Sequence, residues 1–454
     1  MTLEKESLSI LSEALEILES SFDDLPVFQP ELDLVSLRTV LLETAKKMQQ
    51  NFPYPHPYYA GQMLKPPHAV ARLAYMLSLW VNPNNHALDG GLASSAMEKE
   101  VVANLATLFQ WQNHLGHLCG GGTMANLEAL WIAGKLRPGK KVVASQQAHY
   151  THSRISEVLN LEFQGVPVTS NAQMDLNALQ ALLDKGDIGT VVVTMGTTSV
   201  GAVDPLPDIL RLRQRYGFRI HADAAYGGYF HLTDNLDEQA RRAFDALAEV
   251  DSLVIDPHKH GLQPYGCGCV LFRDPAVGRF YHHDSPYTYF TSDDLHLGEI
   301  SLECSRPGAA AVALWATQKL FPMVPNGEFA RSLSACRSAA LGLFERLQKD
   351  PRFLTAFPPQ LDIVIWGPKA KTAQEMSHFS QRIFQAAAGK NLHLAIAKLP
   401  QSLLEPYWPD FVWDSKTVTL LRSCLMKPEH LAWLDSIWET LSALCEPILK
   451  PLGD

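Results

Sequence analysis

The sequence predicts an α/β protein with a largely parallel sheet covered by helices on both faces, followed by a smaller α/β domain. Two observations predict this fold class. From residue 114 onward, short apolar runs alternate with stretches of helical periodicity, as in repeated strand–helix–strand units. Within each run successive residues are apolar, which is typical of strands that are buried on both faces.

Length and composition bound the classes of function. The 454 residues are enough for two or three packed units, and a hydrophobic content of 46% provides a large core. The net charge of −10, without a run of Lys or Arg, argues against nucleic acid as a partner. Seven cysteines without framework spacing fit a reducing, cytoplasmic compartment. We expect no signal peptide and no membrane span.

The N-terminal region, residues 1–65, is expected to be a helical and extended segment. Leucines recur with helical spacing near the N-terminus and predict an amphipathic helix. Residues 52–67 are rich in Pro, Tyr and His, so they are expected to be extended. Helices are predicted over residues 69–81 and 95–110, with a polar loop over residues 82–94 between them.

The large domain is expected over residues 66–320. Its predicted strands are short and apolar, and one of the helices between them begins with Pro. The strands are predicted at residues 141–144, 190–194, 219–222, 253–255 and 269–272, and the helices between them at residues 126–133, 176–183 and 205–216.

A second change of pattern marks a small C-terminal domain, expected over residues 321–454. A helix over residues 309–320 leads into a long helix over residues 328–348. Strands near residues 361–366 and 418–422 flank a further helix. This alternation predicts a second, smaller α/β unit.

A lysine stands at the end of a predicted strand, in the sequence Ser-Leu-Val-Ile-Asp-Pro-His-Lys-His of residues 252–260. Lysines normally occupy solvated faces because burial of the ammonium group costs several kcal/mol or forces the amine to be neutral. Lys259 is therefore a candidate nucleophilic amine of the kind that forms a Schiff base. An exposed lysine on a hairpin is the alternative that this stretch alone leaves open.

A glycine-rich turn, Gly120-Gly-Gly-Thr-Met-Ala-Asn126, precedes a predicted helix. The glycines allow the backbone to approach a ligand closely, and Thr123 is expected to cap the helix. Free backbone N–H groups and the helix dipole favour an anion there, best of all a phosphate. Such turns are common before helices, so the turn by itself does not establish a phosphate site.

Two more side chains follow predicted strand ends. His149 presents a flat ring that can stack on a planar ligand, although a lone loop histidine is more often solvated. Asp223 lies among small residues, where a carboxylate needs a cation such as a protonated ring nitrogen; a turn-capping aspartate is the alternative. Ligands of open parallel sheets gather at these strand ends. Together with Lys259 and the glycine-rich turn, these residues describe one ligand, pyridoxal 5′-phosphate.

These stretches, with Gly196-Thr-Thr198 and His221-Ala-Asp-Ala-Ala-Tyr226, resemble the pyridoxal-phosphate-dependent group II amino-acid decarboxylases of the aspartate-aminotransferase fold (fold type I). The resemblance covers roughly residues 57–315. It implies a mostly parallel seven-stranded sheet and decarboxylation of an L-amino acid to the amine and CO₂. It also implies a homodimer, with the active site at the subunit interface and the N-terminal segment packed on the partner.

The resemblance further implies a role for each matching residue. Lys259 holds the cofactor as a Schiff base, Asp223 pairs with the pyridinium nitrogen, and His149 stacks on the ring and is a candidate donor of a proton to Cα. The residues that hold the phosphate are Gly122, Thr123 and His258, and those that line the ring are Thr198 and Ala225.

Two arginines are candidates for binding the substrate carboxylate. Arg422 resembles a C-terminal arginine of the superfamily and is the preferred candidate. Arg306 is a second conspicuous arginine, for which a structural or phosphate-side role is at least as compatible with the sequence.

One stretch departs from the family pattern. Many members carry a tyrosine on a mobile loop that protonates Cα, and its replacement diverts the product to an aldehyde. The corresponding residues 290–301 contain no tyrosine, and we predict that His296 is the loop acid. Tyr287 and Tyr289 lie just upstream. The amine is therefore the expected product and an aldehyde the alternative.

The identity of the substrate is left open by the sequence. Aromatic residues in the stretch 52–59, with Tyr226 and Phe290, favour an aromatic L-amino acid; an acidic or diamino acid is the alternative. The loop over residues 82–94 is also expected to contribute to the pocket. A carbon–carbon lyase of the same fold and a non-enzymatic member of the fold are further alternatives. A metal-dependent hydrolase that uses some of the 17 histidines is an alternative of another class, but we expect no metal.

Overall fold

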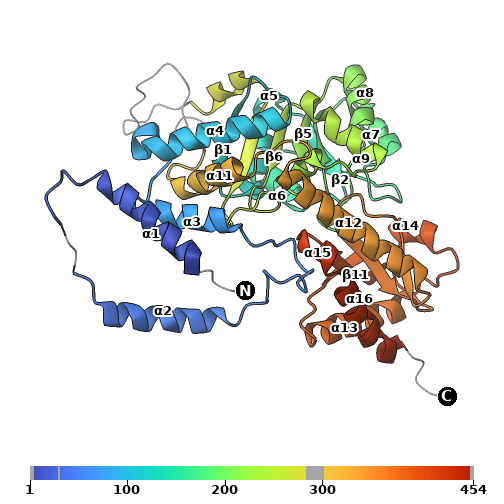
Figure 1. The fold of residues 1–454 in the computed structure, drawn as a ribbon. Coiled ribbons are helices and arrows are strands. Elements are labelled where there is room, and N and C mark those ends of the chain that lie inside the picture. The colour runs from blue at the N-terminus through green and yellow to red at the C-terminus, as the bar shows by residue number, and fades with distance from the viewer. Residues whose placement is uncertain (1–4, 29–30, 283–300, 450–454) are drawn as a thin grey trace.

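The computed structural model describes residues 5–28, 31–282 and 301–449 (Figure 1). Three parts follow one another: N-terminal helices, a large domain around a seven-stranded sheet, and a small domain around a four-stranded sheet. In Figure 1 the N-terminal helices extend to one side of the two domains. The loop candidate His296 lies outside the described residues, as do Tyr287, Tyr289 and Phe290.

The large sheet has the strand order β1-β7-β6-β5-β4-β2-β3. Strand β7 runs antiparallel to both of its neighbours, and the other six strands are parallel to one another. The prediction of a mostly parallel seven-stranded sheet is thus confirmed. The strands are β1 (Leu115–Cys119), β2 (Lys141–Ser145), β3 (Phe163–Val166), β4 (Ile188–Thr194), β5 (Arg219–Asp223), β6 (Ser252–Ile255) and β7 (Gly268–Phe272).

Two strands of this sheet, β1 and β3, were not predicted, because neither contains a continuous apolar run. Strand β1 contains Gly116 and His117, and β3 contains Gln164 and Gly165. Each strand nevertheless completes a ladder, β1 against β7 and β3 against β2. Pairing with a neighbouring strand, and not the local pattern, decides that these residues are extended.

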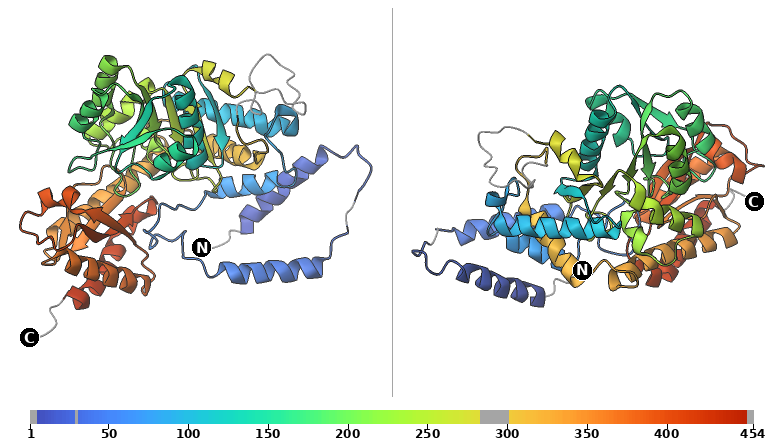
Figure 2. Two further views of the ribbon diagram at one scale, coloured as in Figure 1. Left: turned by 180° about the vertical axis from the view of Figure 1, so that it is seen from behind. Right: turned by 90° about the horizontal axis from the view of Figure 1, so that it is seen from above.

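Helices lie on both sides of the large sheet (Figure 2), as the alternating pattern predicts. The prediction for α5 is wrong in one detail: its N-cap is Gly121, with φ +143°, and Thr123 makes no capping hydrogen bond because it is the second helical residue. The helices of this domain are α3 (Ala69–Ser78), α4 (Leu92–Leu108), α5 (Gly122–Leu136), α6 (Thr151–Val158), α7 (Leu176–Leu183), α8 (Leu206–Tyr216), α9 (Glu238–Asp245) and α11 (Gly308–Leu320).

The small domain has an antiparallel sheet with the order β10-β11-β9-β8. Helix α12 joins the two domains: Phe329 near its start belongs to the main core, and Leu343 belongs to the core of the small domain. The domain boundaries at residues 65 and 320 stay predictions. The elements are α12 (Glu328–Lys349), β8 (Phe353–Thr355), β9 (Ile363–Pro368), α13 (Ala373–Ala388), β10 (Ala395–Pro400), α14 (Gln401–Leu404), β11 (Thr417–Cys424), α15 (Glu429–Ala432) and α16 (Leu434–Leu449).

The N-terminal region contains α1 (Lys5–Ser20) and α2 (Leu34–Met48). Helix α2 has no buried residue, and Figures 1 and 2 show it apart from the two domains. In the part of the chain that the structure describes, none of the helices has the length and the apolar character needed to cross a lipid bilayer.

A buried carboxyl group in α5 makes the stability of the large domain dependent on pH. Glu128 accepts a hydrogen bond of 3.0 Å from Tyr281 Oη and lies 2.9 Å from His117 Nε2. Burial is the largest influence on this group and raises the pKa of Glu128 to about 8. Because the folded pKa lies above the unfolded one, the stabilisation is complete below about pH 4 and is lost as the pH rises through the folded pKa.

We expect Glu128→Gln, which imitates the protonated carboxyl group, to weaken this pH dependence. Urea unfolding between about pH 5 and 8 should show a decrease in unfolding free energy that is smaller than in the unsubstituted protein, by up to about 1.4 kcal/mol per pH unit. The exposed Glu345 provides the control, since Glu345→Gln should leave the slope unchanged. Equal slopes for Glu128→Gln and the unsubstituted protein would show that Glu128 is not the group that titrates.

Candidate active site

A cavity of about 530 Å³ opens at the carboxyl ends of the parallel strands. Its walls come from the segments that follow β1, β2, β4, β5 and β6. This is the edge at which ligands bind in open α/β sheets. The structure brings all of the predicted cofactor residues to this cavity: Gly122, Thr123, His149, Thr198, Asp223, Ala225, His258 and Lys259.

Lys259 lies in the connection between β6 and β7. Its Nζ is 3.0 Å from Asp256 Oδ2, and its side chain is 23% exposed, against 2% for Asp256. The amine therefore faces the cavity while the carboxylate that holds it is buried beneath. This placement favours the nucleophilic amine over the exposed hairpin lysine.

Asp223 ends β5 and is held by His152, a histidine for which the sequence predicts no role. The Oδ2 atom of Asp223 is 2.8 Å from His152 Nε2, and Oδ1 accepts a hydrogen bond of 3.2 Å from the backbone N–H of Ala225. His152 is fully buried in the first turn of α6. No local pattern marks His152 as the donor that this buried carboxylate needs, because the two residues are 71 positions apart in sequence.

The surroundings of Asp223 favour its charged form. Burial is the largest influence and alone would raise the pKa of Asp223, but the hydrogen bond from His152 and the electrostatic influence of His152 and Lys259 hold it well below its usual range. Such a carboxylate can keep a proton on a ring nitrogen that lies against it.

Two histidines of the cavity wall are neutral near pH 7. Burial is the main cause that lowers the pKa of His149 and the pKa of His258. The Nδ1 atom of His149 accepts a hydrogen bond of 3.3 Å from the N–H of Thr151, and His258 Nδ1 lies 2.8 Å from the carbonyl oxygen of Cys267. Both rings are thus held in place by backbone atoms.

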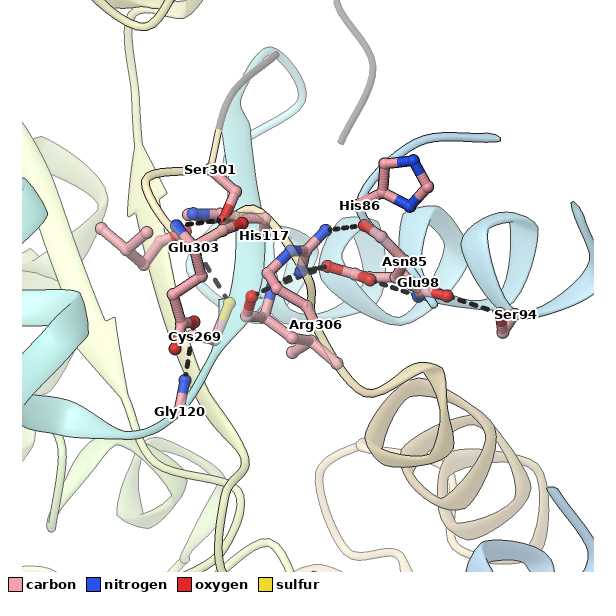
Figure 3. Close-up of polar contacts among 12 residues, drawn as sticks. Asn85, His86, Ser94, Glu98, His117, Gly120, Cys269, Ser301, Glu303 and Arg306 are labelled. Carbon is pink, nitrogen blue, oxygen red and sulfur yellow. Dashed lines mark hydrogen bonds and ion pairs between the residues drawn. The ribbon is translucent and has the colours of Figure 1, made fainter. Parts of the chain in front are cut away.

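The glycine-rich turn leads into the N-terminus of α5. The first N–H groups of a helix have no partner within it, and the helix dipole adds positive potential there. A Cβ at Gly122 would lie only 2.6 Å from Asp256 Oδ2, so glycine is needed for the turn to pack against the Lys259 segment. The N–H of Gly120 donates a hydrogen bond of 3.1 Å to Glu303 (Figure 3).

Arg306 has a structural role. Its Nη1 donates hydrogen bonds of 2.7 Å to Glu98 Oε1 and to the carbonyl oxygen of Leu118, and its Nη2 donates one of 2.7 Å to the carbonyl oxygen of Asn85 (Figure 3). Arg306 and Glu98 are both buried. Asn85 belongs to the loop over residues 82–94, so that loop anchors α11 and does not line the cavity.

Arg422 lies in β11 of the small domain and touches the cavity wall. Its Nη2 donates a hydrogen bond of 2.8 Å to the carbonyl oxygen of Thr198. The side chain is buried, and its Nε has no hydrogen-bond partner among the described residues. Of the residues expected to determine the substrate, Tyr226 lines the cavity, whereas the aromatic stretch 52–59 does not.

Comparisons with known proteins agree with this geometry. A family described as the pyridoxal-dependent decarboxylase conserved domain matches residues 127–367, more than half of the chain. The chain belongs to the pyridoxal-dependent decarboxylases. It is 26% identical over 431 residues to an L-tyrosine decarboxylase of Enterococcus faecium, with 71% of this chain and 70% of that protein covered. It is 33% identical over 234 residues to a probable L-tyrosine/L-aspartate decarboxylase of Methanoregula boonei, which is 51% of this chain and 62% of that protein.

The fold of the decarboxylase is also found among solved structures. A crystal structure of Oryza sativa TDC with PLP and tryptamine matches with a TM-score of 0.78 at 16% identity, covering 99% of this chain and 100% of the other. At this identity the likeness concerns the fold.

The decarboxylase uses pyridoxal 5′-phosphate, and its cavity fits this cofactor. The start of α5 suits the phosphate, the buried charge of Asp223 suits the pyridine nitrogen, and Lys259 suits the aldehyde. Within the described residues, no group of three or more His, Cys, Asp and Glu side chains is arranged to hold a metal ion. The metal-hydrolase alternative thus has no ligand set in this part of the chain.

Proposed function

We propose that this decarboxylase converts an aromatic L-amino acid, with L-tyrosine as the first candidate, into the corresponding amine and CO₂. The convergence of Lys259, Asp223 and the start of α5 on one cavity carries the proposal for the reaction. The substrate is supported by the names of the two relatives, which refer to tyrosine or to tyrosine and aspartate. Tyr226 in the cavity wall is compatible with an aromatic side chain.

The residues of the chain divide the work of this reaction. Bound pyridoxal phosphate supplies an electron sink for the electron pair of the breaking bond between Cα and the carboxylate. Lys259 would hold the cofactor through its side-chain amine, which the substrate amine would replace. The charge of Asp223 would keep the pyridine nitrogen protonated and so maintain the electron sink. His149 would hold the ring from one face, and its imidazole could carry a proton from solvent to Cα.

Arg422 is proposed to bind the substrate carboxylate together with the backbone around Thr198. We expect Arg422→Gln to raise KM and to lower kcat/KM by about 10- to 100-fold, since one charge-assisted hydrogen bond is lost. Steady-state kinetics of CO₂ release would measure both constants. Arg382, which is exposed on α13, is the control because Arg382→Gln should change neither. An unchanged KM in Arg422→Gln would assign the carboxylate to another residue.

A panel of L-amino acids tests the proposed reaction and substrate. Cofactor-loaded protein is incubated with aromatic, acidic and diamino acids, and mass spectrometry identifies the products. Tyramine and CO₂ from L-tyrosine are expected. If only an acidic or a diamino acid released CO₂, that amino acid would be the substrate in place of L-tyrosine. If an aldehyde formed with ammonia and peroxide, the aldehyde would be the product in place of the amine. Bound cofactor without any CO₂ release would move the assignment to a carbon–carbon lyase.

The proposal includes a homodimer. Helix α2 has no buried residue, although most of its positions along one side are apolar. Its exposed apolar side chains include Leu34, Val35, Leu37, Val40, Leu41 and Leu42. An apolar surface of this kind is typical of an interface, and a second copy of the chain is the partner that the family resemblance implies. Sedimentation equilibrium of the holoenzyme should give twice the mass of one chain.

We further infer a reducing, cytoplasmic compartment. All seven cysteines lie in the described residues, each is a free thiol, and Cys304 is the one that is exposed. Proteins of oxidising compartments commonly pair such residues in disulfides. Because Cys304 is exposed, titration of the native protein with a thiol reagent should modify this residue first.

A further inference from the structure

Asp362 is a buried carboxyl group that the proposed reaction does not use. It directly precedes β9 in the small domain and is 0% exposed. Its Oδ1 accepts a hydrogen bond of 2.5 Å from Tyr226 Oη, and its Oδ2 lies 3.3 Å from His260 Nε2. Tyr226 lines the cavity, and His260 directly follows Lys259. One carboxylate of the small domain thus reaches two neighbours of the candidate active site.

The rings around this carboxylate leave Tyr226 little freedom. Its ring lies 4.9 Å from the ring of His260, which in turn packs 5.0 Å from Phe230. On the other side, a Cβ at Gly196 would be 3.2 Å from Tyr226 Cδ1. The position of the Tyr226 ring along the cavity wall is therefore determined by its neighbours and by the one polar bond to Asp362.

Stability alone gives no reason for a carboxyl group at this position. Asp362 stands between Leu361 and Ile363, which are fully buried apolar residues. Burial is the largest influence on Asp362 and raises its pKa to about 6, against the opposing effects of Tyr226, Lys65 and Arg422. A buried carboxyl group costs more stability than an apolar side chain of similar volume.

The small domain touches the cavity wall at two adjoining places. Asp362 binds Tyr226, and Arg422 binds the backbone of Thr198. The two residues belong to neighbouring chain segments, because the N–H of Leu425 donates a hydrogen bond of 2.8 Å to the carbonyl oxygen of Asp362, and Leu425 follows β11 closely. The wall formed by Thr198 and Tyr226 is thus held from the small domain.

We propose that Asp362 is a positioning residue, whose carboxylate fixes Tyr226 in the cavity wall and packs against His260 in the segment that carries Lys259. This inference rests on the proposed role of Lys259 as the residue that binds the cofactor. Because small displacements of a positioned group cost much of the rate, the expected loss on removing the carboxylate is large relative to one hydrogen bond.

Three variants of the holoenzyme test this proposal: Asp362→Asn, Tyr226→Phe and the double variant Asp362→Leu/Tyr226→Phe. We expect each to lower kcat/KM by about 10- to 100-fold, mainly through kcat. The visible absorption band of the bound cofactor is a second readout, which needs no substrate. Because Tyr226 lines the cavity, its displacement in Asp362→Asn should change this band.

The double variant separates positioning from stability. Replacement of both partners by apolar groups leaves neither a Tyr226 hydroxyl nor an Asp362 carboxyl group buried without the other, so the thermal midpoint should return toward that of the unsubstituted protein while kcat/KM stays low. A matched control is the pair Glu128→Gln and Tyr281→Phe, a buried carboxyl–tyrosine contact that does not line the cavity. These controls should keep kcat, KM and the absorption band unchanged.

Two results would overturn the proposal. A double variant with unchanged kcat/KM and an unchanged absorption band would show that Asp362 has no positioning role. If Asp362→Asn lowered the thermal midpoint but left kcat/KM and the absorption band unchanged, Asp362 would have a role in stability alone. Failure of the proposed function is recognised separately, by turnover that persists in Lys259→Ala; the cofactor dissociation constant and the absorption band of Asp362→Asn still decide the role of Asp362 in that case.

Discussion

Lys259→Ala is expected to lower kcat/KM for decarboxylation by about 10⁴-fold or more, because a positioned nucleophile is removed. The amine faces the cavity and lies 3.0 Å from the buried carboxylate of Asp256. Without it, the cofactor is held by the phosphate and ring contacts alone and has no covalent bond to the chain. CO₂ release and the absorption spectrum of the bound cofactor measure the two effects.

A second variant, Lys259→Arg, distinguishes the effect of losing the nucleophilic amine from the effect of losing its positive charge. Lys259→Arg can keep the ion pair with Asp256 but has no amine that attacks an aldehyde, so the same loss is expected. Lys185, exposed on the surface, is the control, and Lys185→Ala should be fully active. Activity in Lys259→Arg near that of the unsubstituted protein would exclude covalent attachment at this residue.

Asp223→Asn is expected to lower kcat by about 10²- to 10³-fold, the usual effect of removing one preorganised charge from a catalytic site. The variant keeps the shape of the side chain and removes the charge that holds a proton on the pyridine nitrogen. Because the pKa of Asp223 is held well below its usual range, the kcat/KM of the unsubstituted enzyme should show no ionisation of this group near neutral pH. Steady-state kinetics and the spectrum of the bound cofactor provide the measurement.

Substitution of His152, which orients Asp223, is expected to have a smaller effect than substitution of Asp223 itself. In His152→Gln the carboxylate of Asp223 remains but loses the bond of 2.8 Å that orients it, so a loss of about 10-fold in kcat is expected. A loss in Asp223→Asn no larger than that in His152→Gln would mean that the charge of Asp223 does not act on the cofactor.

The large sheet was predictable because its strands are buried on both faces and read as apolar runs. The stretches around β2, β4, β5, β6 and β7 each show this pattern. Strands β1 and β3 were not predicted, because a glycine and a polar residue interrupt the apolar run in each of them. Their extended conformation depends on a partner strand that is remote in sequence.

The candidate site was predictable to the same extent. Lys259, Asp223 and His149 follow strand ends, and the topology of a parallel sheet brings such positions to one edge. The role of His152 was not predicted, because its partner Asp223 lies 71 residues away in sequence. Thr123 was wrongly expected to cap α5, since the positive φ of Gly121 allows the helix to begin two residues earlier.

The sequence by itself therefore determined the α/β class, the cofactor chemistry and the residues at the strand ends, because these depend on local composition and on order along the chain. Only the tertiary structure decided which distant groups meet. It paired His152 with Asp223, placed Arg306 in a buried network with Glu98, and brought Asp362 of the small domain to Tyr226. Such contacts join elements far apart in sequence and follow from packing, which no local pattern encodes.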